Sequence, residues 1–193
     1  MPPVPEDRIA TRRLALRPVA PADAVDVQAL AGNWDVARML ADMPHPLTLD
    51  LARQWSEAAA TDHTYAITLE GRMIGGVSLC AVEQDQLSTG AELGFWLGKP
   101  WWGRGFAREA GAALIARHPR RGDGATITSG HFFDNPASAR VLEVLGFVAT
   151  GALSQWCLAR QDAVNAVRYA LPGGWIAPEA GCAIRALDDE TKD

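Results

Sequence analysis

The stretch Gly98–Arg108 reads Gly-Lys-Pro-Trp-Trp-Gly-Arg-Gly-Phe-Ala-Arg and has the residue types of an anion-binding turn. Glycine at positions 103 and 105 lets the backbone turn and approach a ligand closely, because neither residue carries a Cβ. A helix predicted to follow would present the free N–H groups of its first turn, where its dipole favours negative charge. Arg104 and Arg108 add two cations. The stretch therefore predicts a phosphate or pyrophosphate site, although a tight strand-to-helix loop would use the same glycines.

Two common nucleotide-binding motifs do not fit this stretch. A dinucleotide-binding GxGxxG fingerprint would need glycine where the chain has Arg108, and it would follow a strand early in the chain. The phosphate-binding pattern GxxxxGK[ST] is also absent from the sequence. A nucleotide-binding protein stays as an alternative, and it predicts stabilisation by ATP or NAD.

The elements that hold this turn in place follow from the hydrophobic periodicity. A strand is predicted before the turn and a helix after it, and the next strand should lie parallel to the first through a right-handed crossover. The pattern predicts an α/β (α+β) fold with a mixed, mostly antiparallel sheet of about six or seven strands and helices on both faces. Strands are predicted over 14–17, 65–69, 73–82, 90–97, 125–133, 147–158 and 164–171, and helices over 21–31, 34–43, 49–60, 103–118 and 136–145.

The overall composition excludes several classes of protein. Of 193 residues, 48% are hydrophobic and 21% are charged, as in an ordinary globular domain. A formal net charge of −5 leaves no general basic surface for nucleic acid. The longest apolar stretch, Ala110–Ala116, is too short to span a membrane. The start of the chain, rich in proline and acid, does not resemble a signal peptide, so we expect a cytoplasmic protein.

Neither internal repeats nor linker-like segments divide the chain. We expect one domain over residues 11–171, a flexible N-terminus over residues 1–10 and a C-terminal tail over residues 172–193. Three cysteines and four histidines are scattered without metal-ligand spacing, so we expect no metal cofactor.

Three stretches, in order along the chain, resemble the GNAT acetyltransferases. They are Glu92–Leu97 (ELGFWL), Trp102–Ala110 (WGRGFAREA) and Asp134–Phe147 (DNPASARVLEVLGF). The opening TRRLALRP of residues 11–18 and the turn Glu70–Arg72 resemble the Rim-type branch, which acetylates N-terminal amines of ribosomal proteins. The resemblance covers most of residues 11–171. It implies the acyl-CoA N-acyltransferase fold, acetyl-CoA as cosubstrate and a primary amine as acceptor.

The resemblance also assigns the cofactor-binding residues. The family pattern [Q/R]xxGx[G/A] falls on Trp102, Gly105 and Ala107, with tryptophan in place of the superfamily's Gln or Arg. It implies that backbone N–H groups of this turn bind the pyrophosphate, with an arginine near the 3′-phosphate, and that a splayed strand holds the pantetheine arm. Asn135 would contact the arm, and it also suits the cap of the helix that begins at Pro136. The predicted cofactor-binding residues are Trp96, Leu97, Trp102, Gly103, Arg104, Gly105, Phe106, Ala107, Arg108, Asn135 and Ser138.

Acetyl transfer to an amine needs a base, a positioned thioester, an oxyanion donor and a proton for the leaving thiolate. Glu92 is the predicted base, because its strand ends beside the turn and because the family places an acid here; the alternative is a pair with a neighbouring strand. Backbone N–H groups of Trp96 or Leu97 are the predicted oxyanion donors. The tyrosine that many members use as general acid is replaced by Leu142, so Ser138 or water is expected to protonate the thiolate.

The acceptor pocket is expected where this fold usually shapes it, in the helices before Pro44. Trp34, Met39 and Met43 lie there. His131, at the end of a predicted strand, is placed at the border of the same pocket, although a hydrogen-bonded strand histidine is the plainer interpretation.

The predicted function is direct transfer of acetyl from acetyl-CoA to a primary amine. Cys80 lies in the middle of an apolar strand, a poor place for a covalent nucleophile. The preferred acceptor is the N-terminal α-amine of a peptide or protein, since its unperturbed pKa of about 8 needs only a modest base. The alternatives are a small amine, such as a polyamine or aminoglycoside, and a non-catalytic acyl-CoA-binding regulator. A homodimer is expected from the family, with Trp175 and Ile176 as a contact.

Overall fold

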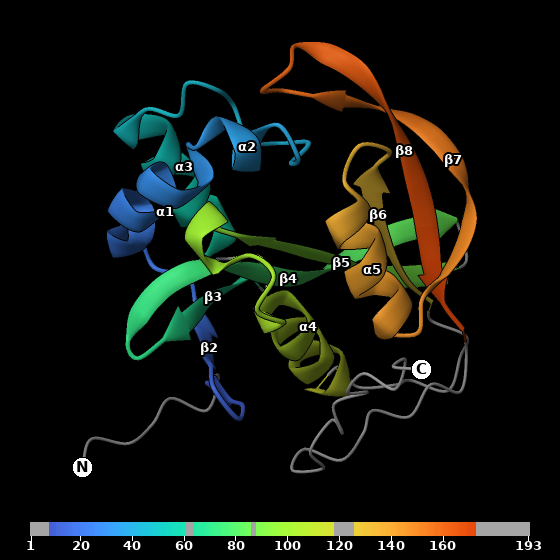
Figure 1. Ribbon diagram of the computed structural model, residues 1–193, viewed down its shortest axis with the longest axis horizontal. Coiled ribbons are helices and arrows are strands. Elements are labelled where there is room, and N and C mark those ends of the chain that lie inside the picture. Colours follow the sequence, from blue (N-terminus) through green and yellow to red (C-terminus); the bar gives the residue numbers. More distant parts are fainter. Residues whose placement is uncertain (1–7, 61–63, 86–87, 118–125, 173–193) are drawn as a thin grey trace, which may run out of the picture.

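An eight-stranded mixed sheet runs through the computed structural model, which describes residues 8–60, 64–85, 88–117 and 126–172 (Figure 1). Its strand order is β1-β2-β3-β4-β5-β6-β8-β7. The strands are β1 (Ile9–Ala10), β2 (Ala15–Pro18), β3 (Thr64–Leu69), β4 (Arg72–Asp85), β5 (Ser88–Leu97), β6 (Ile127–Phe132), β7 (Val148–Cys157) and β8 (Asp162–Leu171). The helices are η1 (Pro21–Asp23), α1 (Ala24–Ala31), α2 (Trp34–Ala37), α3 (Leu49–Ala59), η2 (Lys99–Trp101), α4 (Phe106–Arg117) and α5 (Pro136–Val144).

The predicted mixed sheet is confirmed. Neighbouring strands pair antiparallel except β5 and β6, which are parallel and are joined through α4, as the strand–helix–strand pattern predicted. Strand β1 is the one strand beyond the predicted seven in the described residues. It forms because Thr11 closes a tight turn: its N–H donates to the Leu14 carbonyl, and the Leu14 N–H donates to its hydroxyl, both at 2.9 Å. Ile9 and Ala10, the last two residues of the predicted N-terminal segment 1–10, pair with β2.

Two predicted helices are shorter than expected, for different reasons. Helix α4 begins at Phe106 rather than at position 103, because Gly103 and Gly105 have φ of +72° and +74°, outside the helical region. Helix α2 ends at Ala37 rather than at Met43.

The carbonyls beyond α2 bond elsewhere. The carbonyl of Arg38 accepts from Arg160 Nε at 2.7 Å, and that of Ala41 accepts from the Leu158 N–H at 2.9 Å. A longer helix would use these carbonyls internally, so tertiary contacts with the β7–β8 connection override the local helical pattern.

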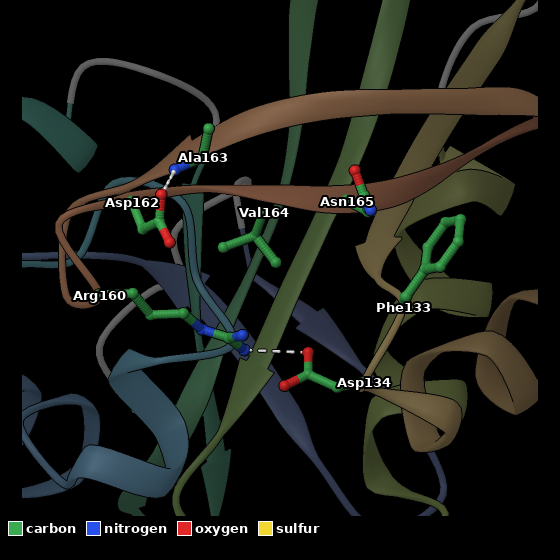
Figure 2. Close-up of a pocket in the computed structure, with 7 residues that line it drawn as sticks. All are labelled: Phe133, Asp134, Arg160, Asp162, Ala163, Val164 and Asn165. Carbon is green, nitrogen blue, oxygen red and sulfur yellow. Dashed lines mark hydrogen bonds and ion pairs between the residues drawn. The ribbon is translucent and has the colours of Figure 1, made fainter.

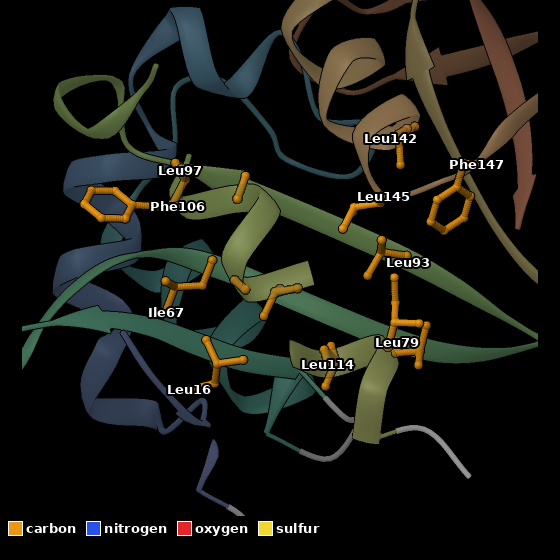
Figure 3. Close-up of a cluster of buried hydrophobic side chains, with 14 of the residues drawn as sticks. Leu16, Ile67, Leu79, Leu93, Leu97, Phe106, Leu114, Leu142, Leu145 and Phe147 are labelled. Atoms are coloured by element: carbon orange, nitrogen blue, oxygen red, sulfur yellow. The ribbon is translucent and has the colours of Figure 1, made fainter. Parts of the chain in front are cut away.

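Two hydrophobic clusters lie on opposite faces of the sheet. Helices α4 and α5 cover one face, where Leu145, directly after α5, and Leu93 of β5 point toward one another (Figure 3). Helices α1, α2 and α3 contribute to the other cluster, which includes Trp96 of β5, packed edge-on against Trp55 of α3. Because side chains alternate along a strand, Leu93 and Trp96 face opposite ways. No helix in the described ranges is long and apolar enough to cross a membrane.

Candidate active site

The central strands β5 and β6 diverge (Figure 1). Strand β5 pairs with β4 along its length, as far as Leu97 with Gly75. With β6 it pairs only at Ala91 and Glu92. The Ser129 hydroxyl donates to the Leu93 carbonyl at 2.7 Å, and β6 then continues along β8 alone. The last part of β5 therefore has an edge that no other described strand covers, which is the splay that the resemblance implied.

The direction of each backbone amide along β5 can be fixed from two hydrogen bonds. The Ala91 N–H donates toward β6, to Thr126, whereas the Gly98 N–H donates toward β4, to Ile74. Successive N–H groups alternate, so the amides of Phe95 and Leu97 face the open edge and that of Trp96 faces β4. Of the two amides predicted as oxyanion donors, only that of Leu97 lies on the open edge.

Trp102 closes the end of this edge. Its indole Nε1–H donates to the Leu97 carbonyl at 2.7 Å, although the ring itself is exposed. The tryptophan that replaces the superfamily's Gln or Arg thus ties the turn to the end of β5.

The glycine turn lies directly after this point. The Glu109 N–H donates to the Gly105 carbonyl at 3.1 Å, so the amides of residues 106–108 precede the first intrahelical bond and have no helical partner. The side chains of Phe106 and Ala107 are buried in the α4 cluster, and these two residues can offer a ligand only their backbone. Gly103, Arg104 and Gly105 are exposed. The turn therefore presents main-chain donors at the surface, beside the open edge of β5.

Arginines surround the turn. Arg104 lies over the ring of Phe106 at 4.9 Å, and the Nε of Arg108 is buried without a hydrogen-bond partner in the described part of the chain. Arg13, from the segment before β2, donates from Nη1 to the Arg104 carbonyl at 3.0 Å. Its Nε donates to Glu109 at 2.7 Å. Arg13 and Glu109 were not predicted as site residues, because periodicity and short motifs do not reveal a contact between residues 96 positions apart.

Glu109 is well supplied with donors. Burial alone would raise the pKa of the Glu109 carboxyl, but hydrogen bonds from Thr11 and Arg13 outweigh burial and hold that pKa below its ordinary value. The surrounding donors therefore stabilise the ionised form of Glu109.

Glu92, the predicted base, is at the last paired position of β5 and β6. It lies across from Cys80 on one side and Thr128 on the other, and its side chain is exposed. Because Leu93 faces the α4 and α5 cluster, Glu92 lies on the opposite face of the sheet. No ion pair with another described residue engages it, so the alternative of a cross-strand pair is not seen.

The start of α5 is capped as predicted. The Asn135 side chain accepts from the Ser138 N–H at 3.2 Å, and Pro136 occupies the first turn. Ser138 is half-buried on this turn, and Leu142, where many members have a tyrosine, is fully buried.

His131 is half-buried near the end of β6. Strand alternation from Thr128 puts its ring on the face opposite to Glu92, 5.4 Å from the ring of Tyr169. Its Nδ1 is 2.8 Å from the Phe132 carbonyl, so Nδ1 carries the proton and donates. Its Nε2 is buried and has no hydrogen-bond partner in the ranges that the structure describes.

The three residues predicted to line the acceptor pocket do not share one environment. Trp34 is exposed and lies 5.1 Å from the ring of His45. Met39 is half-buried against Arg160. Met43 is only 1% exposed, within the core formed by α1, α2 and α3, and its role in the acceptor pocket stays a prediction.

Asp134, just before α5, joins three segments. It accepts from Arg38 after α2 at 2.5 Å and from Arg160 of the β7–β8 connection at 3.0 Å. The hydrogen bond from Arg160 is the main reason that the pKa of Asp134 lies below its ordinary value, and partial burial opposes it. Arg160 and Asp134, which face one another in Figure 2, line a cavity of about 430 Å³ together with Phe133, Asp162, Ala163, Val164 and Asn165.

The arrangement suits a long ligand with an anionic end. The glycine turn and its arginines fit a diphosphate, as the partnerless Arg108 Nε indicates, and the open edge of β5 fits an amide-bearing arm. Among the residues that the structure describes, no group of three or more His, Cys, Asp or Glu side chains could hold a metal ion.

Comparison with known proteins identifies the family. The family described as "Acetyltransferase (GNAT) domain" matches residues 13–148, more than half of the chain. The chain therefore belongs to the GNAT acetyltransferases. It is an acyltransferase that uses acetyl-CoA as cosubstrate. The family resemblance inferred from the sequence is confirmed. Among curated proteins, no match was found.

Solved structures show the same fold. A GNAT-family acetyltransferase from Bacillus anthracis has a TM-score of 0.73 at 18% identity, covering 85% of this chain and 97% of that one. RimL, a ribosomal L7/L12 alpha-N-protein acetyltransferase in complex with coenzyme A, has a TM-score of 0.72 at 23% identity, covering 84% and 96%. An acetyltransferase from Salmonella typhimurium that modifies the N-terminal serine of L7/L12 has a TM-score of 0.70 at 22% identity, covering 84% and 97%. At these identities the likeness is one of fold.

Proposed function

We propose that this acetyltransferase transfers acetyl directly from acetyl-CoA to the N-terminal α-amine of a peptide or protein. The proposal rests above all on the divergence of β5 from β6 beside the glycine turn, with Glu92 at the point where the two strands part. RimL and the Salmonella enzyme, named for acetylation of ribosomal L7/L12, support an N-terminal acceptor.

In the proposed mechanism, the pyrophosphate binds the amides of the turn and the pantetheine arm lies along the open edge of β5, which brings the thioester to the gap between the strands. The Leu97 amide faces this gap and donates to the carbonyl oxygen as negative charge develops. The acceptor nitrogen forms a bond to the carbonyl carbon, and the carbon–sulfur bond then breaks.

Two protons move in this reaction. Glu92, on the face opposite to α4 and α5, takes the proton that the acceptor amine loses, through a water molecule. Ser138 or water returns a proton to the thiolate. An N-terminal α-amine needs less from such a base than a lysine does, since its unperturbed pKa is about 8 rather than about 10.4.

Exchange of Glu92 for glutamine tests the proposal. We expect E92Q to lower kcat at least about a hundredfold, the usual contribution of a general base, and to leave the Kd for acetyl-CoA unchanged. E57Q, at an exposed position of α3, is the matched control and should retain activity. Full activity of E92Q would refute the assigned base, and absence of turnover in the wild type with any acceptor would favour a non-catalytic acyl-CoA-binding regulator.

A panel of acceptors tests the substrate class. Thiol release is measured with peptides that have a free N-terminus, with the same peptides blocked at the N-terminus but containing lysine, and with polyamines and aminoglycosides. We expect turnover with the free N-termini. Turnover confined to polyamines or aminoglycosides would overturn the peptide acceptor and keep the acetyltransferase.

A cytoplasmic location, a domain spanning residues 11–171 and a homodimer stay proposals. The predicted dimer contact, Trp175 and Ile176, lies outside the described residues, as does most of the predicted tail. Cell fractionation tests the location, and light scattering during size-exclusion chromatography tests the dimer.

A further inference from the structure

The segment before β2 reaches the cofactor turn through one arginine. Arg13 donates to the Glu109 carboxylate twice, from its backbone N–H at 2.8 Å and from Nε at 2.7 Å. Its Nη1 donates to the Arg104 carbonyl at 3.0 Å. Thr11 adds a third donor to Glu109 at 2.6 Å. The guanidinium is therefore held at two positions, by the Glu109 carboxylate at Nε and by the Arg104 carbonyl at Nη1.

The remaining edge of this guanidinium points at the turn. Its Nη2 lies 3.5 Å from the point where a Cβ on Gly105 would stand, and the Nη2 of Arg108 lies 3.9 Å from the same point. The Arg13 guanidinium also stacks on the ring of Phe106, with its Cζ 4.5 Å from the ring centroid. No described residue accepts a hydrogen bond from Arg13 Nη2, so two guanidinium groups from distant segments converge on one glycine with free donors.

The charges around the turn do not balance. Three arginines, Arg13, Arg104 and Arg108, lie around the turn, and among the described residues only Arg13 has an ion pair, with Glu109. The buried Nε of Arg108 lacks a partner in the same residues. Like charges held close together repel, and a buried donor without a partner is costly. A doubly charged diphosphate supplies both the missing charge and the missing acceptors.

We propose that Arg13 is a further diphosphate-binding residue, and that Glu109 is the positioning residue that holds its guanidinium over the turn. The inference deepens the proposed function and rests on acetyl-CoA binding at the glycine turn. It makes the N-terminal segment, 91 residues before Arg104 in the sequence, a part of the cofactor site.

Neighbouring arginines provide a matched pair of variants. R13Q and R12Q each remove one positive charge at adjacent positions, but Arg12 is exposed and has no contact with the turn among the described residues. By calorimetry, we expect R13Q to weaken CoA binding about tenfold or more, and R12Q to weaken it less than about twofold. R13K keeps the charge without the planar fork that reaches both Glu109 and Arg104, so its loss should be intermediate. E109Q should weaken CoA binding in the same direction as R13Q.

Truncated ligands separate binding of the diphosphate from a general effect on the fold. R13Q should weaken 3′-dephospho-CoA as much as CoA, because both carry the diphosphate. It should leave the KM for S-acetylpantetheine, which has no diphosphate, unchanged. A wild-type affinity of R13Q for CoA, an equal loss with S-acetylpantetheine, or a loss confined to CoA with its 3′-phosphate would each overturn the proposal.

G105V distinguishes failure of this inference from failure of the proposed function. If G105V weakens CoA binding and R13Q does not, only the role of Arg13 is refuted. If neither variant weakens CoA binding, the glycine turn is not the cofactor site. Thermal unfolding accompanies each variant, and R13K carries the test if R13Q does not fold.

Discussion

Two carboxylates, Glu109 and Asp134, accept hydrogen bonds from arginines on the two sides of the gap between β5 and β6. They differ in burial. Glu109, on the cofactor side, has a side chain 13% exposed and receives donors from Thr11 and Arg13. Asp134, on the side of the β7–β8 connection, is 41% exposed and receives two arginines. Exposed ion pairs are weak and are screened by salt, whereas shielded carboxylates with several donors are held firmly. We therefore expect the cofactor side to be the stiffer half of the site and the Asp134 side to be the half that can adjust.

The largest effect on activity is predicted for G105V, on the cofactor side. Gly105 has φ of +74°, and a branched side chain there both strains the backbone and keeps a ligand away from the turn's amides. We expect the KM for acetyl-CoA to rise about a hundredfold, because more than one charge-assisted hydrogen bond to the ligand is lost. Steady-state kinetics measures this change.

G151V, at an exposed glycine of β7 with open space around it, is the control. An unchanged KM in G105V would refute the assignment of the turn.

On the adjustable side, D134A is expected to act on the acceptor. Loss of the carboxylate releases Arg38 and Arg160 from the start of α5, while the bond from Arg160 Nε to the Arg38 carbonyl still joins the segment after α2 to the β7–β8 connection. We expect the KM for the acceptor to rise about tenfold, with no change in the Kd for acetyl-CoA. D50A, which removes an exposed ion pair with Arg53 on α3, should change neither value. A loss of acetyl-CoA affinity in D134A would show that the two sides are not independent.

The smallest effect concerns stability, and it sharpens the difference between the two carboxylates. E109Q should lower the free energy of unfolding at pH 7 by about 2 kcal/mol, and D134N by less than about 1 kcal/mol. Both pKa values are lowered in the folded state, so both contributions are present above the unfolded-state pKa, about 4, and are lost as pH falls through the folded-state value. The free energies of unfolding of the variants and the wild type should therefore converge at low pH. Urea unfolding of each protein from pH 7 to pH 3 measures them. Equal losses for E109Q and D134N at pH 7 would contradict the comparison.

Local signals in the sequence were enough for the sheet, the turn and the face of Glu92. Two glycines, a strand before them and a helix after them are neighbours in the chain, and alternation with Leu93 sets the direction of Glu92. Contacts between distant segments were not accessible in this way. The pairing of Arg13 with Glu109 belongs to this group.

The structural features near the acceptor side that the sequence did not predict have the same origin. The end of α2 at Ala37 depends on partners in the β7–β8 connection, more than a hundred positions away. Burial of Met43 and the face of His131 depend on how α2, α3 and β8 pack, which periodicity within one segment does not report.

The bond from the Trp102 indole to the Leu97 carbonyl has a consequence for solubility. A bare strand edge in the middle of a sheet is a template on which a strand of another chain can add, and such additions lead to aggregation. Here the exposed stretch is only a few residues long, and the indole occupies its terminal acceptor. A foreign strand would find too few pairing positions to dock, while a slender arm with one or two amide groups would find enough.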